Sequence, residues 1–258
     1  MLTLATFYWK DRFVASGIHF AISLVIALLA AVLVFVLWYP YPYREISGGR
    51  ELFFIVIVVD VILGPLITFT VFSRTKSKRE LRRDLAMVAL IQLAALSYGV
   101  WTVFIARPVH LVFEYDRFRV VHAVDVQLEL LGRAPPGIDP LPVTGPTLLS
   151  LREFSDSEEK MDATMLALQG ISLASRPDLW RSYAAALPEI REVAQPVAVL
   201  KARFASQAAA IDAVIARAGR RPEAAVFVPM VGRKTFWTVF LDQATGEVLA
   251  YMPLDSFD

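Results

Sequence analysis

The chain has 258 residues, of which 56% are hydrophobic, and its mean hydropathy of +0.52 is too high for an ordinary soluble protein of this length. It contains no cysteine, which excludes disulfides, Cys-ligated metal or iron–sulfur centres and thiol nucleophiles. Residues 1–106 carry ten basic and six acidic side chains, and residues 107–258 carry sixteen and nineteen, so the two parts have net charges of +4 and −3. Neither part has the basic excess of a nucleic-acid-binding protein.

Three apolar segments predict transmembrane helices at about residues 13–38, 51–72 and 84–106, which together form a membrane domain over residues 1–106. The first segment follows Lys10 and Arg12 and is too long for the core of a secretory signal, so we expect an uncleaved anchor. Prolines at positions 40 and 42 end this helix. The aromatic rings around them are expected at the lipid headgroups: Trp38, Tyr39, Tyr41 and Tyr43.

A short basic loop between the second and third segments sets the expected topology. It carries six basic residues against one acid: Arg74, Lys76, Lys78, Arg79, Arg82 and Arg83. By the positive-inside rule this loop stays in the cytoplasm, where it contacts anionic lipid, and a cytoplasmic protein partner is the alternative role. Three crossings then place the N-terminus in the cytoplasm and everything after Arg107 outside, which in a Gram-negative cell means an inner-membrane protein with a periplasmic domain.

Residues 107–258 predict this extracytoplasmic α+β domain. A hairpin is expected from strands at 109–114 and 118–126, followed by a loop at 132–147 with five prolines and three glycines and a short strand at 148–154. A helix should begin in the acidic run at 155–159 and extend to about residue 170. Two further helices and three closing strands follow: 177–194, 196–218, 224–228, 235–241 and 247–251.

The second predicted span has an aspartate and a Gly-Pro pair near its middle, at Asp60, Gly64 and Pro65. Its sixteen strongly apolar residues each favour insertion by roughly 0.3–0.6 kcal/mol, against about 2.5–3.5 kcal/mol for one Asp, so the segment inserts. Pro65 has no N–H to bond the carbonyl of Val61, and a kink is therefore expected.

A carboxylate at such a depth needs a partner, a water-filled cavity or a proton. Asp60 and Ser97 should lie at the same depth, roughly 18–20 Å from the basic loop, with Gln92 and Tyr98 at neighbouring depths on the third span. Three roles stay open for Asp60: a structural hydrogen bond that locks the helices together, recognition of a partner helix, and a chemical role.

Five motifs in one order resemble the type IV pilin accessory proteins of the TfpX/TfpZ family: residues 39–43, 59–68, 84–99, 106–109 and 113–118. The resemblance covers about residues 16–126. It implies an inner-membrane protein that assists the assembly, stability or display of a particular type IV major pilin. It carries over no catalytic residue.

Further candidate residues lie outside the membrane segments. Trp237, on a late strand, is predicted to be a core or edge aromatic residue, and the alternative is that it forms, beside Arg233 and Lys234, a partner-binding edge to which an incoming chain could add. None of the three histidines has metal-ligand spacing to another, so no metal site is assigned. The sequence has no nucleophile elbow, P-loop, dinucleotide fingerprint or zinc-protease motif, and no catalytic residue or cofactor is assigned.

The sequence therefore predicts a non-enzymatic, chaperone-like accessory factor that binds a type IV pilin and membrane lipids, but no nucleic acid. One alternative is a membrane-anchored sensor whose outer domain binds a small ligand, although no cytoplasmic segment is long enough for an output domain. The other is a pilin-modifying enzyme, which an altered pilin mass would reveal.

Overall fold

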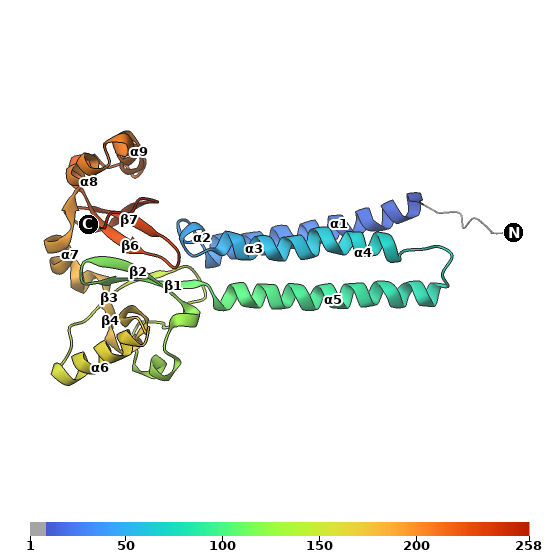
Figure 1. The fold of residues 1–258 in the computed structure, drawn as a ribbon, viewed down its shortest axis with the longest axis horizontal. Coiled ribbons are helices and arrows are strands. Elements are labelled where there is room, and N and C mark those ends of the chain that lie inside the picture. The colour runs from blue at the N-terminus through green and yellow to red at the C-terminus, as the bar shows by residue number, and fades with distance from the viewer. Residues whose placement is uncertain (1–8, 258) are drawn as a thin grey trace. The chain divides into compact units, whose positions relative to one another are not determined.

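Three long helices make up the first of the two units into which the chain divides (Figure 1). The computed structural model describes residues 9–257; the first unit contains residues 9–37 and Gly49–Ile105, and the second contains Trp38–Gly48 and residues 106–257. The elements of the first unit are α1 (Trp9–Val32), the π-helical η1 (Leu33–Trp38), α3 (Gly49–Ile57), the π-helical η2 (Val58–Leu63), α4 (Gly64–Val71) and α5 (Lys78–Ile105).

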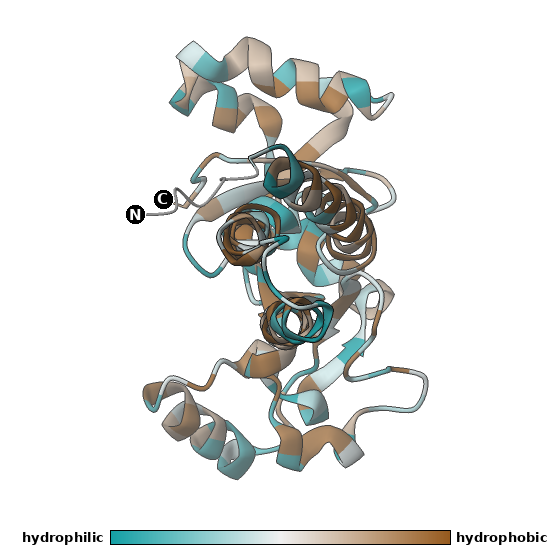
Figure 2. Ribbon diagram, turned by 90° about the vertical axis from the view of Figure 1, so that its right-hand side faces the viewer, coloured by the Kyte–Doolittle hydropathy of each residue, from teal (hydrophilic) through white to brown (hydrophobic). Residues whose placement is uncertain are grey.

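All three predicted spans are confirmed as helices. Continuous helices run over Trp9–Trp38, Gly49–Val71 and Lys78–Ile105, and each is long and apolar enough to cross a membrane. Figure 2 shows the three helices coloured mostly as hydrophobic residues. Both α1 and α5 pack against the helix that runs from α3 to α4.

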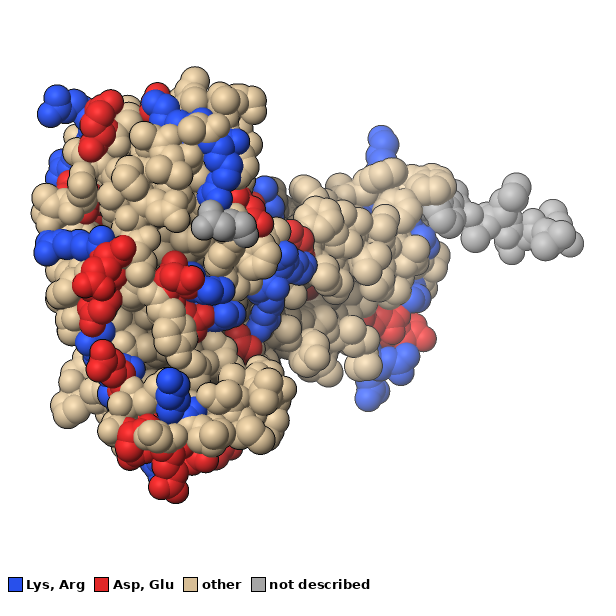
Figure 3. All heavy atoms as spheres, turned by 60° about the vertical axis from the view of Figure 1, so that its left-hand side comes forward, with Lys and Arg blue, Asp and Glu red and all other residues tan. Residues whose placement is uncertain are grey.

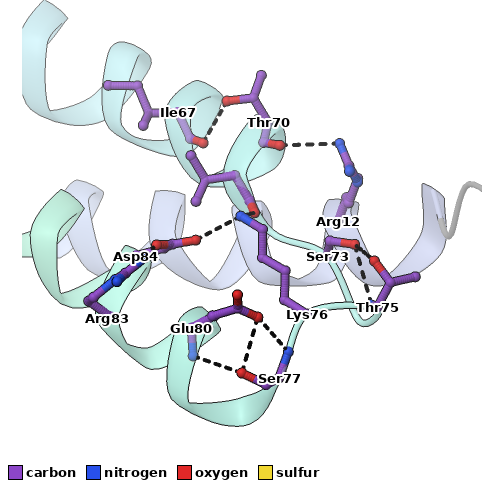
Figure 4. Close-up of polar contacts among 11 residues, drawn as sticks. Arg12, Ile67, Thr70, Ser73, Thr75, Lys76, Ser77, Glu80, Arg83 and Asp84 are labelled. Atoms are coloured by element: carbon purple, nitrogen blue, oxygen red, sulfur yellow. Dashed lines mark hydrogen bonds and ion pairs between the residues drawn. The ribbon is translucent and has the colours of Figure 1, made fainter.

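The third helix begins six residues before the predicted boundary because a capping box starts it. Ser77 and Glu80 exchange hydrogen bonds: the Glu80 N–H donates to Ser77 Oγ over 3.3 Å, and the Ser77 N–H donates to Glu80 Oε2 over 3.0 Å (Figure 4). The basic residues of the predicted loop from Lys78 onward therefore lie on the first turns of α5.

The second unit is built on one mixed sheet of eight strands. Its strands are β1 (Pro108–Glu114), β2 (Arg117–His122), β3 (Thr147–Leu151), β4 (Trp180–Ser182), β5 (Gln195–Pro196), β6 (Ala225–Val231), β7 (Phe236–Asp242) and β8 (Val248–Met252). The spatial order is β4-β3-β1-β2-β6-β7-β8, and β5 pairs with β6 off this path. The β1–β3 and β2–β6 pairs are parallel, and the other pairs are antiparallel.

Helices and short loops cover both faces of this sheet. The helices are α2 (Tyr43–Ile46), α6 (Ser157–Leu168), α7 (Leu187–Val193), α8 (Val197–Arg203) and α9 (Ala208–Arg217). Three apolar clusters form the core: one under α2 and α7, one under α8 and α9, and one around Trp180 beside the β1–β3 part of the sheet. Figure 3 shows acidic and basic side chains interspersed over the visible face of this unit.

Most predicted elements of the second unit are confirmed, including the first hairpin and the three closing strands, and no helix or strand is found over residues 134–146. Strand β2 ends at His122, four residues before the predicted end, because the chain turns there into a 3-10 helix at Ala123–Asp125. The closing hairpin is held by the Gly246 N–H, which donates to the carbonyl of Asp242 over 2.8 Å; Gly246 has a φ of 73°, in the left-handed region.

The two predicted Ala-rich helices are wrong in extent. Over residues 177–194 only α7 is α-helical, because Trp180–Ser182 pairs with β3 as an edge strand and Pro188 lies at the start of the helix. Over residues 196–218 the helix breaks at Phe204, whose φ and ψ of −117° and 58° are not helical, and α8 and α9 result. Apolar periodicity does not distinguish one helix from two short helices that bury the same face.

The segment between the first two spans is part of the core of the second unit. Tyr43 and Ile46 are buried in the apolar cluster under α7, and the Tyr43 hydroxyl lies 3.4 Å from that of Tyr251 on β8. Burial raises the pKa of the Tyr43 phenol well above its usual value. Of the four aromatic rings expected at the headgroups, only that of Tyr41 is exposed, and the other three are buried in the protein.

Candidate functional site

A π-helical turn places Asp60 directly before the Gly-Pro pair of the second span. In η2 each N–H bonds the carbonyl five residues earlier, so the carbonyl of Asp60 would pair with residue 65. Pro65 has no N–H to supply. The side-chain amide of Gln92 supplies the donor from α5, with Nε2 lying 3.3 Å from the Asp60 carbonyl oxygen.

Gly64 makes this contact sterically possible. A Cβ atom at Gly64 would lie 1.8 Å from Gln92 Nε2 and 2.7 Å from Gln92 Cδ. Only glycine leaves room for the amide at this position. The Gly-Pro pair thus does two things at once: Pro65 removes a helix donor, and Gly64 admits the side chain that replaces it.

The carboxylate of Asp60 has a different environment from its carbonyl. The residue is 7% exposed. Its Oδ1 atom is buried and has no hydrogen-bond partner among residues 9–257. A buried carboxylate oxygen without a donor is costly in an apolar medium, so this atom marks a position where a donor from another molecule would be stabilising.

Asp60 lines a cavity of about 280 Å³ between two helices, which we call the Asp60 cavity. One wall is formed by residues 52–60 of α3 and η2, and the other by residues 95–103 of α5. The two helices approach closely at the cavity itself, since a Cβ at Gly99 would lie 2.6 Å from Val56 Cγ2 and both residues belong to the lining. Almost all of the lining is apolar, and Asp60 is its one charged residue.

The structure brings some of the predicted intramembrane residues together and separates others. Gln92 contacts Asp60 through the backbone carbonyl and not through the carboxylate. Tyr98 lines the Asp60 cavity and is 74% exposed. Ser97 is exposed and lies outside the cavity lining. Successive side chains of an α-helix point in directions about 100° apart, so Ser97 does not share the direction of its neighbour Tyr98. Equal depth alone does not place two residues on facing sides of their helices.

A second set of polar contacts, between α1 and α4, is absent from the sequence prediction. Ser16 Oγ donates to the carbonyl of Pro65 over 2.8 Å, and His19 Nδ1 lies 2.5 Å from Thr68 Oγ1. Ser16 and His19 are polar residues one helix turn apart on the first span, and this pattern could have predicted a contact with a neighbouring helix.

The basic segment of residues 74–83 also ties the helices to one another (Figure 4). Lys76 Nζ lies 2.7 Å from Asp84 Oδ2 and donates to the carbonyl of Val71, at the C-terminal end of α4, over 3.0 Å. Arg74 pairs with Asp11 of α1 over 2.7 Å. The remaining four basic residues of the cluster are exposed: Lys78, Arg79, Arg82 and Arg83.

The predicted partner edge near Trp237 does not exist in the sheet. Strand β7 pairs with β6 on one side and β8 on the other, and Trp237 is buried. Arg233 and Lys234 lie in the exposed turn between β6 and β7, where Arg233 pairs with Asp125 over 3.2 Å. A run of β-favouring residues does not reveal whether a strand is central or at an edge.

Among residues 9–257, no group of three or more His, Asp or Glu side chains is placed to hold a metal ion. The sequence singled out Asp60 itself, but it did not predict the cavity that Asp60 lines.

Comparison with known proteins identifies the class to which this arrangement of three long helices and a mixed-sheet domain belongs. The family model of the fimbrial assembly protein FimB matches residues 7–48. Two fimbrial assembly proteins of Dichelobacter nodosus, of serogroups I and E1, are 37% and 36% identical over 255 residues, which is 96% of this chain and 99% of each relative. A third, of serogroups C1 and C2, is 42% identical over 129 residues, 48% of this chain and 98% of the relative. No solved structure matches significantly.

The chain is thus a member of the fimbrial assembly protein family. The matched residues 7–48 contain the first span and the segment that enters the core of the second unit.

Proposed function

We propose that this protein is an inner-membrane accessory factor, of the TfpX/TfpZ kind, that assists the assembly, stability or display of a type IV pilin by binding it and not by catalysis. The names of the relatives support a role in fimbrial assembly. Three helices long and apolar enough to cross a membrane support an integral location. The partner is a pilin that, before assembly, has a transmembrane helix in the same bilayer.

The proposed topology rests on two independent features. The exposed basic residues that start α5 favour a cytoplasmic position for the connection between the second and third spans. The connection between the first and second spans, Trp38–Gly48, belongs to the same unit as residues 106–257, so both must lie on one side of a membrane. Three crossings satisfy both conditions, with the second unit in the periplasm.

The observation that carries the binding proposal is the buried Oδ1 atom of Asp60, which has no hydrogen-bond partner among residues 9–257. In hydrocarbon a polar group without a partner costs several kcal/mol, and helices in membranes associate through close packing and interhelical hydrogen bonds. A partner helix that packs over the opening of the cavity between α3 and α5 would meet apolar walls and one acceptor at a fixed depth. We therefore assign the cavity to a transmembrane helix of the pilin that carries a hydrogen-bond donor at the depth of Asp60.

The test is co-purification of the pilin with this protein from detergent-solubilised membranes. Asp60→Ala should abolish co-purification while the protein level stays unchanged. Ser97→Ala removes a polar group at a similar depth on an exposed face of α5, and it should leave co-purification intact. Retained pilin in the Asp60→Ala variant would reduce Asp60 to a structural residue and remove the support for this binding site.

A membrane-anchored sensor is the second candidate function. The observation that favours it is a cavity of about 410 Å³ in the second unit, lined by charged and polar side chains. Ligand-dependent change in pilus number would distinguish a sensor from a factor that acts on the pilin alone.

A further inference from the structure

A polar cavity of about 410 Å³ in the second unit lies where two parallel strands end. Strands β2 and β6 run parallel and pair only at Phe118–Met230 and Arg119–Val231. Beyond these pairs the two strands separate, and the cavity is lined by the end of β2, the turn after β6 and residues 170–175. We call it the His122 cavity. The carboxyl ends of adjacent parallel strands are a common place for ligand sites, because the chains diverge there and leave a crevice.

Asp125 orients His122 at the end of β2. His122 Nδ1 lies 3.2 Å from Asp125 Oδ2, and the other carboxylate oxygen, Oδ1, accepts from the Arg233 guanidinium over 3.2 Å. An ionised carboxylate only accepts hydrogen bonds, so Nδ1 carries a proton, and in the neutral ring Nε2 then carries the lone pair. The histidine, 1% exposed, thus offers an acceptor in a fixed position.

Two polar atoms of the cavity-lining residues lack partners. His122 Nε2 and Ser172 Oγ are buried, and neither has a hydrogen-bond partner in the part of the chain that the structure describes. Buried polar atoms of this kind are rare in folded proteins, because each leaves its desolvation cost uncompensated. They mark where a ligand would gain hydrogen bonds.

Two arginines of the lining keep donors available. Arg119 binds Glu114 through Nε at 2.5 Å, and Arg233 binds Asp125 through one terminal nitrogen. No other hydrogen bond joins either guanidinium to residues 9–257, so further N–H groups of both face ligand or solvent. With two arginines and one aspartate, the lining has a net charge of +1, which matches a monoanion.

We propose that the His122 cavity binds a carboxylate that has an N–H donor on a neighbouring atom. The carboxylate is held by Arg119 and Arg233, whose planar guanidinium groups match its geometry. The N–H of the ligand donates to His122 Nε2, and Ser172 Oγ forms a hydrogen bond with a further polar atom of the ligand. Exposed Val124 and partly buried Ile171 provide an apolar wall for a small side chain. Two sources have this chemistry: the C-terminal residue of a peptide and a free acylated amino acid.

A neighbouring depression extends the site. It is lined by Glu114, Arg117 and Leu173 among others, and it shares Arg119 and residues 170–172 with the His122 cavity. The two together provide room for the residues that precede a terminal carboxylate, which favours the peptide source.

Three probes test the proposal on the full chain in detergent by isothermal titration calorimetry: N-acetyl-trialanine with a free carboxylate, the same peptide as its C-terminal amide, and N-acetylalanine. The free acid should bind at least about tenfold more tightly than the amide, the ratio expected for loss of charge-assisted hydrogen bonds. Equal binding of acid and amide would overturn the proposal, as would no binding of either acid at about 10 mM. If N-acetylalanine binds as tightly as the peptide acid, the ligand is a free acylated amino acid. If N-acetylalanine binds more weakly, the ligand is the C-terminal residue of a peptide.

Matched variants locate the binding. Arg233→Gln should weaken binding of the free acid at least about tenfold, and Ser172→Ala should weaken it about two- to tenfold. Arg220 is the control, because it is similarly exposed and also pairs with an aspartate, Asp242, over 2.7 Å, but lies outside the cavity lining. Arg220→Gln should leave binding unchanged. Equal losses in Arg233→Gln and Arg220→Gln would contradict the assignment.

Discussion

Gln92 donates a side-chain hydrogen bond to the backbone carbonyl of Asp60, 3.3 Å away, from one long helix of the first unit to the next. The bond exists because the π-helical turn before Pro65 leaves this carbonyl without a helix donor. It fixes α5 against η2 next to the Asp60 cavity. The geometry of the candidate site therefore depends on one glycine, one proline and one glutamine.

Gly64→Ala should destabilise the first unit by displacing the Gln92 amide. Loss of the bond with a buried carbonyl left unpaired should cost about 1–3 kcal/mol, measured by thermal unfolding in detergent. Gly17→Ala, where a Cβ has nothing within 4 Å, should be neutral or stabilising by up to about 1 kcal/mol. If the amide is the cause, Gly64→Ala in a Gln92→Ala background should add little further loss. Full additivity of the two changes would argue against it.

Gly232→Ala should destabilise the second unit through the segment that connects the first two spans. A Cβ there would lie 2.2 Å from Ile46 Cγ1 and 3.1 Å from the Ile46 carbonyl oxygen, and Ile46 is buried. Overpacking of this kind costs about 1–3 kcal/mol. Gly132→Ala has nothing within 4 Å and is the control. Equal unfolding temperatures for both variants would mean that the segment does not belong to this core.

His110 should make the second unit less stable in mild acid. Its ring is buried, with Nδ1 2.6 Å from Thr147 Oγ1 and Nε2 3.1 Å from the carbonyl of Pro140, and burial lowers its pKa to about 4. The unfolded chain takes up this proton near its ordinary pKa of about 6.5 and the folded protein does not, so stability falls as pH drops from about 6.5 to about 4 and then levels off. The loss amounts to about 3 kcal/mol.

The check on His110 is the denaturation midpoint of the full chain between pH 7 and pH 4, for the wild type and His110→Gln. Glutamine can donate to Pro140 and accept from Thr147 without titrating, so the variant should lose less stability over this range. Parallel pH curves for the two proteins would assign the acid sensitivity to other groups.

The topology gives a fourth prediction. Alkaline phosphatase fused after residue 258 should be active, because it would lie in the periplasm, and the same reporter inserted at Thr75, in the connection between α4 and α5, should be inactive. A cytoplasmic fluorescent reporter should give the reverse pattern. An active phosphatase at Thr75 would invert the proposed orientation.

Long-range packing explains which sequence predictions failed. The three spans and the closing strands were predictable, since sustained apolar runs and period-two patterns are local signals. The entry of Tyr43 and Ile46 into the core of the second unit was not, because it joins residues about 60 to 200 positions apart in the sequence. The Asp60 cavity and the His122 cavity were also not predictable, because residues distant in the sequence line each of them. Asp60 was identifiable as an unusual residue, whereas the pairing of its carbonyl with Gln92, and the unpartnered Nε2 of His122, depend on how elements meet.

Cross-linking between the Asp60 cavity and the pilin tests the central claim most directly. The chain has no cysteine, so Tyr98→Cys, in the cavity lining, and Leu29→Cys, on an exposed face of α1, would each carry its only thiol. With a thiol-directed cross-linker in intact cells, Tyr98→Cys should yield a product with the pilin, Leu29→Cys should not, and adding Asp60→Ala should abolish the product. Equal cross-linking from both positions, or none from position 98, would contradict the account.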